Sequence, residues 1–486
     1  MERKLPRNVL LSVIFATLGS SFRWGYNMSI VNPTYEVLLD LQNKSLARYG
    51  LNNETAMTWI WSTVCGIYFL AAAIAALTFN AIGENVGRRT GLVISQFIFI
   101  VGSLMQAFAY FNLYELFIAG QIVTGLALGL STSLITPYIN EISHESYAPF
   151  LHVLVAVTIE IGTTTANFVG IDDILGEKRR WPIVFVFPVI FNIVCIIFFI
   201  VWGPETPIRL LKCSKRVEAL QSFRFYHQLD DMAAAQLLAE SEKQMATAVS
   251  TRPMTMKQAL VDRANRKALF LACLTGATTN FSGILCITIF GTNIIAQYSE
   301  DSAPYINAGV FATSLFGLLI ALFCVKDFSH RLLLLIGLPI LLVIDIGFAV
   351  VQVMELKGNY AMIIFVSLMI AFCAVFSNTL EKIMVFNGVR ITRYEYLDAT
   401  VSIAVAVTFL TTFLAPLAFY PLQQSYPKFS FVPFIIFLII AWISYFIWYP
   451  NDSRVQPSDL QASQSNFKSS GNEKPLTQTG GTKEKV

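Results

Sequence analysis

Charged residues are scarce in this chain of 486 residues, and their scarcity excludes most soluble folds. Asp, Glu, Lys and Arg together make up 13% of the sequence, whereas 55% of the residues are hydrophobic. A soluble globular chain carries about 25% charged residues. The mean hydropathy of +0.59 points the same way. So apolar a chain is expected to fold with the lipid bilayer as its solvent.

Several signatures of other protein classes are missing as well. The net charge is only +3, which argues against nucleic acid as a partner. The sequence has no P-loop, metal-ligand cluster or nucleophile triad, so we expect no enzyme, no cofactor and no metal. It also lacks the short segments of alternating polarity that build a membrane β-barrel. None of the seven cysteines lies in a candidate outer loop, and we therefore expect no disulfides.

What the sequence does contain is a series of twelve long apolar runs. Each is long enough to cross a bilayer core of about 30 Å as a helix, and lipid offers backbone groups no other partners. We therefore predict an all-α membrane protein with twelve transmembrane helices in two six-helix bundles. The runs lie near residues 9–31, 57–82, 91–111, 114–138, 150–172, 181–202, 267–297, 305–325, 331–353, 360–380, 398–422 and 430–449.

The runs divide into six plus six around a charged segment, and this predicts the domain organisation. We expect an N-terminal bundle at 1–202, a linker with amphipathic surface helices at 203–266, a C-terminal bundle at 267–449 and a disordered tail at 450–486. Twelve spans place both termini and the linker on one side of the membrane. The positive-inside rule makes that side cytoplasmic, although the basic loop at 176–181 falls on the other side.

The longest loop on the opposite side carries two glycosylation sequons. They are "NKS" at Asn43 and "NET" at Asn53. Such sites are modified only in lumenal or extracellular loops. The sequons therefore agree with the predicted topology and favour a multi-pass protein of the plasma membrane.

Five short motifs resemble a known family when they are taken in order. They are "RWGYN" (23–27), "GENVGRR" (83–89), "PYINEIS" (137–143), "GIDDILGEKRRWP" (170–182) and "GPETPIRLL" (203–211). In this order and at these spacings the chain resembles the major facilitator superfamily, specifically the facilitative glucose transporters of the sugar porter family. The resemblance covers residues 9 to about 455 and makes this chain a divergent member.

The resemblance implies passive transport of a hexose or related small solute by alternating access, with a monomeric transport unit in the lipid bilayer. Two alternatives stay open. One is a proton-coupled symporter, because Asn27 stands where proton-coupled relatives carry Asp and Glu160 is available instead. The other is a sensor or scaffold that does not transport and whose sugar site has decayed.

The resemblance also implies a gate of charged residues at the cytoplasmic ends of the helices. Glu205 and Glu141 are expected to meet Arg88 or Arg89 there. Arg331 remains from an eroded counterpart in the second half. Exposed ion pairs are individually weak, at about 0.2–1 kcal/mol, so only a network of them would bias a conformational equilibrium.

The expected solute site departs from the family pattern. Thr279 and Asn280 stand where the family has two Gln, Ser282 matches, and Ser314 replaces an Asn. Together with Asn27, these residues are the predicted solute contacts. The family's Trp in the tenth span has no counterpart. Fewer polar groups predict weak hexose binding, since each lost hydrogen bond costs about 0.5–1.5 kcal/mol. Thr279 and Asn280 are equally compatible with bonds between helices.

Three charged residues fall within the predicted spans, where charges are costly and usually functional or paired. They are Arg23, Glu160 and Asp345. Arg23 and Glu160 lie at depths that differ by about one helical turn. We therefore predict an Arg23–Glu160 ion pair that faces the central cavity. The sequence suggests no partner for Asp345.

Overall fold

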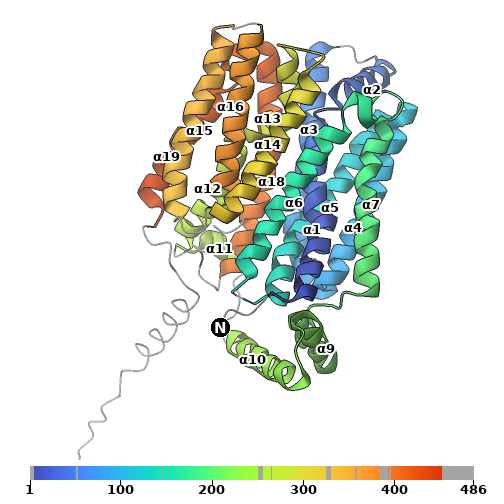
Figure 1. Ribbon diagram of the computed structural model, residues 1–486, viewed down its shortest axis with the longest axis vertical. Coiled ribbons are helices and arrows are strands. Elements are labelled where there is room, and N and C mark those ends of the chain that lie inside the picture. Colours follow the sequence, from blue (N-terminus) through green and yellow to red (C-terminus); the bar gives the residue numbers. More distant parts are fainter. Residues whose placement is uncertain are drawn as a thin grey trace, which may run out of the picture.

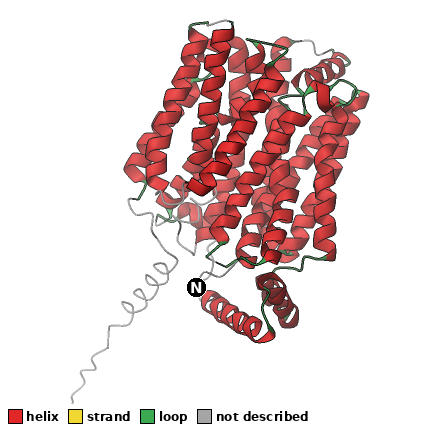
Figure 2. Ribbon diagram, in the orientation of Figure 1, coloured by secondary structure: helices red, strands yellow, loops and turns green. Residues whose placement is uncertain are grey.

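The structure is a computed structural model and consists of helices joined by short loops (Figure 2). It describes residues 5–50, 53–144, 146–249, 256–263, 265–324, 330–355, 358–381, 383, 392 and 396–450. No strand occurs within these ranges. The predicted disordered tail lies outside the described residues.

Two groups of long helices lie side by side (Figure 1). We call them the N half and the C half. The N half consists of α1 (Arg7–Ser29), α3 (Glu54–Val86), α4 (Arg88–Phe108), α5 (Tyr114–Ile142), α6 (Ala148–Val169) and α7 (Trp181–Val201). The C half consists of α12 (Arg266–Asn280) followed by α13 (Ile284–Ala296), then α14 (Ala303–Cys324), α15 (His330–Val353), α16 (Asn359–Asn378), α18 (Leu397–Ser425) and α19 (Val432–Trp448).

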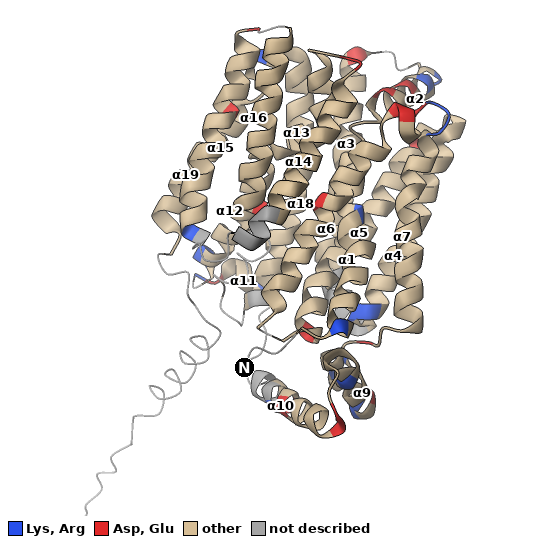
Figure 3. Cartoon of the chain, in the orientation of Figure 1, with Lys and Arg blue, Asp and Glu red and all other residues tan. Residues whose placement is uncertain are grey.

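Short helices occupy the two ends of this body. One end carries α2 (Tyr35–Ala47) and is called the α2 end; the linker helices lie at the opposite end, called the α9 end (Figure 1). The linker contains α8 (Pro207–Lys212), α9 (Arg216–His227), α10 (Asp231–Val249) and α11 (Met256–Val261). Three short helical segments lie in the two halves: η1 (Ala109–Phe111), η2 (Asp172–Gly176) and η4 (Pro427–Phe429). In Figure 3 most of the charged residues, coloured blue and red, lie near these two ends.

The long helices have the properties of membrane spans. Within the described part of the chain, ten stretches are long and apolar enough to cross a bilayer. The helix α1 is less apolar but has a comparable length of 23 residues, and α14 spans 22 residues, of which Ala303–Leu319 form a shorter apolar stretch. Large apolar side chains such as Phe97, Val101 and Leu104 project outward from α4 at helical spacing. These observations confirm the all-α membrane fold, and each predicted run corresponds to helix within about four residues.

Glycine allows several helices to pack backbone against backbone. A Cβ atom at Gly125 or Gly129 in α5 would collide with a carbonyl oxygen of α3. Gly162 in α6 meets the carbonyl oxygen of Phe22 in α1 in the same way. The two halves themselves meet where α3 packs against α18 and α6 packs against α14. At Gly66 on α3, an added Cβ would lie 2.8 Å from the ring of Phe413 on α18.

Two features differ from the sequence-based expectation. The run at 267–297 is not one continuous helix, because it is interrupted after Asn280 and resumes at Ile284. Gly283 at the interruption has φ +99°, a left-handed conformation that costs glycine little and other residues more. The second difference is α2, a helix within what we expected to be a loop.

Candidate functional site

Four of the predicted gate residues, Arg88, Arg89, Glu141 and Glu205, form a partly buried cluster at the α9 end of the N half. Arg88 Nε lies 3.1 Å from Glu141 Oε1, and both side chains are nearly buried, with exposed fractions of 14% and 13%. The second carboxylate oxygen of Glu141 accepts a hydrogen bond from the Thr206 hydroxyl. This ion pair joins α4, α5 and the segment before α8. Because it is largely shielded from solvent, it is stronger than an exposed pair.

Glu205 has a different role from the one we expected. Its Oε1 accepts hydrogen bonds from the backbone N–H groups of Arg88 at 3.0 Å and Arg89 at 2.9 Å, not from their guanidinium groups. Gly87, with φ +94°, leaves room for this carboxylate, since a Cβ there would lie 2.6 Å from Glu205 Oε2. Glu205 therefore caps the N-terminus of α4, where unpaired N–H groups and the helix dipole favour a negative charge.

The remaining arginines of the predicted gate bind carbonyl oxygens at helix ends. Arg89 donates from Nε to the carbonyl oxygen of Phe199 at 2.7 Å, near the end of α7. Arg331 donates from Nη2 to the carbonyl oxygen of Phe446 in α19 at 3.3 Å. Each of these contacts stays within one half of the molecule. In the described residues the predicted gate therefore braces the N half and does not connect it to the C half.

The linker helix α9 is fastened to the same cluster, which the sequence did not reveal. The Ser222 hydroxyl donates to the carbonyl oxygen of Glu205 at 2.7 Å. The Tyr226 hydroxyl donates to the carbonyl oxygen of Pro204, also at 2.7 Å, and Asn8 at the start of α1 donates to the carbonyl oxygen of Phe225. The "GPETPIRLL" segment is therefore held from both sides, by α4 and by α9.

The expected solute residues of the seventh span lie at the interruption between α12 and α13. Thr279 donates to the carbonyl oxygen of Thr275, and Ser282 donates to that of Thr279, so both hydroxyls make local bonds. Asn280 reaches across to α18, where its Nδ2 donates to the carbonyl oxygen of Thr408 at 2.7 Å and to the Thr411 hydroxyl at 2.9 Å. Of the two interpretations left open, the structure shows Asn280 linking helices.

Asn27 has a very different environment. Its side chain is 5% exposed, and neither amide atom has a hydrogen-bond partner among the described residues. The residue lies three positions after Trp24, whose ring contacts that of Phe409 in α18 at 5.4 Å. Residues three apart share a helix face, so Asn27 lies on the face of α1 that turns toward the C half. An unpaired buried amide costs about 1–3 kcal/mol, which points to a function for it.

Glu160 and Ser314 form a polar connection between the two halves. Glu160 in α6 makes a side-chain hydrogen bond with Ser314 in α14, and the Ser314 hydroxyl lies 3.4 Å from that of Ser377 in α16. Glu160 is 8% exposed, and its Oε1 has no partner. The buried hydroxyl of Thr163, one turn along α6, is also unpaired. Unpaired polar atoms of Asn27 and Glu160 therefore lie where α1 and α6 face the C half, and Thr163 adds an unpaired hydroxyl between α6 and α1.

The predicted Arg23–Glu160 ion pair is not formed. Arg23 is fully buried and points between α4 and α5. It donates to the backbone oxygen and hydroxyl of Ser95, both at 3.0 Å, and to the carbonyl oxygen of Ala127 at 2.9 Å. Its guanidinium carbon also lies 5.0 Å from the ring centre of Phe99. The depth comparison matched the two residues along the membrane normal, but it did not fix their directions around the helix axes.

The other predicted sites lie at the surface. Asn43 in α2 and Asn53 before α3 are both exposed at the α2 end.

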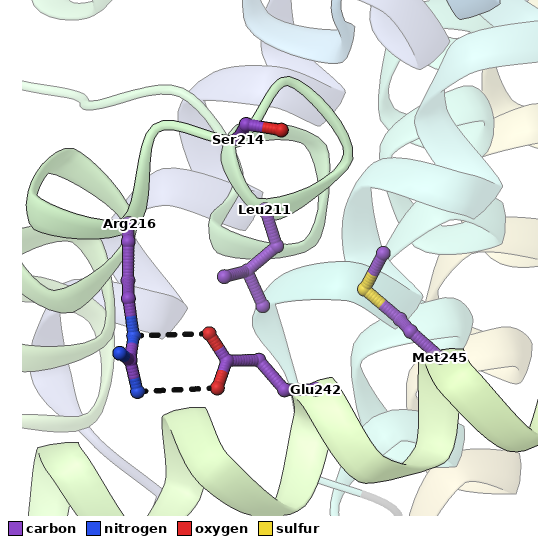
Figure 4. A pocket seen from close by; sticks show the side chains of 5 residues that line it. All are labelled: Leu211, Ser214, Arg216, Glu242 and Met245. Carbon is purple, nitrogen blue, oxygen red and sulfur yellow. Dashed lines mark hydrogen bonds and ion pairs between the residues drawn. The ribbon is translucent and has the colours of Figure 1, made fainter.

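A hollow of about 330 Å³ lies among the linker helices, and its lining includes the exposed Arg216–Glu242 ion pair (Figure 4). It is remote from the polar groups between the halves. The described residues include no cluster of metal ligands.

Comparison with known proteins gives consistent results. A sequence profile of the family described as "Sugar (and other) transporter" matches residues 12–455. The facilitated glucose transporter member 5 of Bos taurus is 26% identical over 352 residues, which cover 70% of this chain and 68% of that protein. Member 3 of Canis lupus familiaris is 22% identical, with coverage of 92% of this chain and 90% of that protein.

The fold is also found in solved structures. The xylose transporter XylE from E. coli, in a partially occluded inward open conformation, superposes with a TM-score of 0.75 and 17% identity, covering 91% of this chain and all of the other. A structure of the proton:xylose symporter XylE bound to 6-bromo-6-deoxy-D-glucose gives the same TM-score with 16% identity, covering 94% and 98%. At these identities the likeness establishes the fold.

The cap that Glu205 provides predicts a measurable loss of stability. We expect Glu205→Ala to lower the free energy of unfolding by about 0.5–2 kcal/mol, because the N-terminal N–H groups of α4 lose their acceptor. The matched control is Glu218→Ala, which removes an exposed pair with Lys215 and should cost less than about 0.5 kcal/mol. Thermal unfolding in detergent measures both, and equal melting temperatures would contradict the capping role.

Proposed function

The chain belongs to the family of sugar and other transporters, and we propose that it moves a hexose or a related small solute passively across a membrane by alternating access. The observation that carries this proposal is the group of buried, unpaired polar atoms on Asn27, Thr163 and Glu160. Asn27 and Glu160 face the junction of the halves, and the Thr163 hydroxyl lies nearby against Gly25 of α1. Amide, hydroxyl and carboxylate groups that lack protein partners are suited to hydrogen bonding with the hydroxyls of a sugar.

The interrupted helix supports the same location for the solute. Substrate sites of transporters built from two repeated halves are typically formed near the membrane midplane by discontinuous helices. The interruption between α12 and α13 carries Thr279, Asn280 and Ser282. Asn280 is engaged with α18 in this structure, so we assign it to positioning α12 and assign direct solute contact to Asn27, Glu160, Ser314 and Thr279.

Bonds between the halves at the α2 end support alternating access. The hydroxyls of Tyr35 and Tyr420 lie 2.9 Å apart, and the backbone N–H of Thr292 donates to Asn32 Oδ1 at 2.9 Å. Deeper in the body, Asn307 donates to Asn167 Oδ1 at 2.7 Å. An opening toward the α2 end must break all three bonds. The cluster at the α9 end keeps its bonds while the N half rocks, because those bonds lie within that half.

We further propose that the α9 end faces the cytoplasm and that the α2 end faces outward at the plasma membrane. The exposed sequons at Asn43 and Asn53 support this orientation.

Labelled-hexose exchange in proteoliposomes tests the proposed transport. We expect Asn27→Ala to slow exchange at least tenfold without lowering the melting temperature, because Asn27 has no protein partner to lose. The comparison variant is Asn280→Ala, which removes the link to α18. It should lower the melting temperature, because the lost link contributes about 0.6–2 kcal/mol to the free energy of unfolding. Unchanged exchange in Asn27→Ala would remove the basis of the proposed site. If a solute stabilised the protein thermally but no solute exchanged, a sensor would replace the carrier.

Glu160 provides a specific observation in favour of proton-coupled symport as a second candidate. It is a buried acid at the junction, with one unpartnered oxygen and no ion pair in the described residues. For a passive carrier we expect an imposed proton gradient to leave the final solute level at equilibrium in both wild type and Glu160→Gln. Accumulation above equilibrium in wild type that is lost in Glu160→Gln would establish symport instead.

The proposed orientation predicts glycosylation at the α2 end. Expression in animal cells should give a protein whose gel mobility increases after treatment with an amidase that removes N-linked glycans. Asn43→Gln combined with Asn53→Gln should abolish the shift, whereas Asn112→Gln, outside any sequon, should not. A shift that persists in the double variant would contradict the assignment of these two sites.

A further inference from the structure

Asp345 is a buried acid that the proposed transport does not use. It lies in α15 on the same inward stripe as Leu341, Ile344 and Phe348, and its exposed fraction is 0%. Neither of its carboxyl oxygens has a hydrogen-bond partner in the part of the chain that the structure describes. An ionised carboxylate held this way in an apolar interior is prohibitively costly, and such a group becomes neutral by binding a proton.

Among the described residues, the helices around Asp345 supply no positive charge. The sequences of α13, α16 and α19, which lie around it in the C half, contain no Asp, Glu, Lys, Arg or His. The thiol of Cys286 on α13 is a titratable group that lies close enough to interact electrostatically with Asp345. Arg266 and Lys267 are the first two residues of α12. They lie about 20 Å from the opposite end of that helix, where the interruption begins. Lys428 in η4 is paired with Glu355.

The carboxyl group is aimed at the interruption between α12 and α13. A Cβ atom placed on Gly283 would lie 3.2 Å from Asp345 Oδ1 and 3.7 Å from Oδ2. Gly283 is the residue immediately before α13, with φ +99°. The first N–H groups of a helix have no acceptor within the helix and carry its positive dipole. The acid therefore lies beside a helix start that attracts negative charge, without being bonded to it.

We propose that Asp345 is a proton-binding site that couples pH to the orientation of α13. In the present conformation the carboxyl group holds its proton. When α13 turns about Gly283 and brings the N–H groups of its first turn to the carboxylate, the O–H bond breaks and the proton passes to water. The ionised carboxylate then accepts hydrogen bonds from α13, and a rise in pH favours this second orientation.

This inference makes α13 the moving element of the proposed alternating access, and to that extent it rests on the proposed function. The α2-end bond from Thr292 to Asn32 begins in α13, so a turn of α13 acts directly on the contact between the halves. One coupled proton shifts the ratio of the two orientations by up to about tenfold per pH unit. Solute exchange should therefore depend on pH even if no proton accompanies the solute.

The first measurement needs no solute and is the melting temperature in detergent between pH 5 and pH 8. An Asp exposed by unfolding releases its proton near pH 4, whereas the folded state keeps one proton more. The contribution of this proton to the free energy of unfolding is therefore present at low pH and is lost as pH rises. We expect the melting temperature of wild type to fall with rising pH more steeply than that of Asp345→Asn. Glu160→Gln, which removes the other buried acid, should leave this difference intact. Asp345→Leu fits the apolar surroundings and replaces Asp345→Asn if the amide is not tolerated.

The second measurement is the pH profile of hexose exchange, which we expect to flatten in Asp345→Asn. Equal melting slopes in wild type and both Asp345 variants would overturn the proton site, whatever the transport result. A difference in melting slopes together with unaltered pH dependence of exchange would overturn the coupling to α13. A difference in melting slopes without any hexose exchange would leave the proton site standing and would refute the proposed function alone.

Discussion

The structure depends on one constraint: inside the apolar body every polar group must find its partner within the protein or incur a large energetic cost. Lipid supplies neither donors nor acceptors, and a missing hydrogen bond in such surroundings costs more than the bond contributes in water. Arg23 meets most of this constraint with three hydrogen bonds and an aromatic face, although its Nε is left without a partner among the described residues. Asn280 meets it by bonding to α18.

Polar groups that fail this test occur in several parts of the body, for example both amide atoms of Gln96 in α4. Two sets of them bear on the proposed function: Asn27 and Glu160 lie where the halves meet, and Asp345 lies beside the interruption of the seventh span. Unsatisfied buried groups in a native protein call for an explanation, and functional sites are where such costs are tolerated. We propose that a solute partners the first group and a proton the second.

The polar bonds at the two ends of the molecule differ in which helices they connect. At the α9 end, Glu205, Glu141 and Arg88 tie helices of the N half to one another and to α9. At the α2 end the bonds of Tyr35 and Asn32 cross from one half to the other. A rocking motion leaves bonds within a half intact and breaks those between halves. Under the proposed alternating access, the charged cluster would provide rigidity and the hydrogen bonds between the halves would bias the conformation.

The sequence by itself determined the solvent of this protein, the number and limits of its long helices, and the motif order that identified its family. These follow from apolar content and run length, which act locally along the chain. Only the tertiary structure decided which way each polar side chain points. Arg23 and Glu160 matched in depth but face different helices, and Glu205 binds backbone N–H groups where charge complementarity suggested arginines. The interruption at Gly283 and the approach of Asp345 to it depend on packing between distant spans. Periodicity along one helix cannot fix its rotation relative to a neighbour, and that rotation determines which polar groups meet.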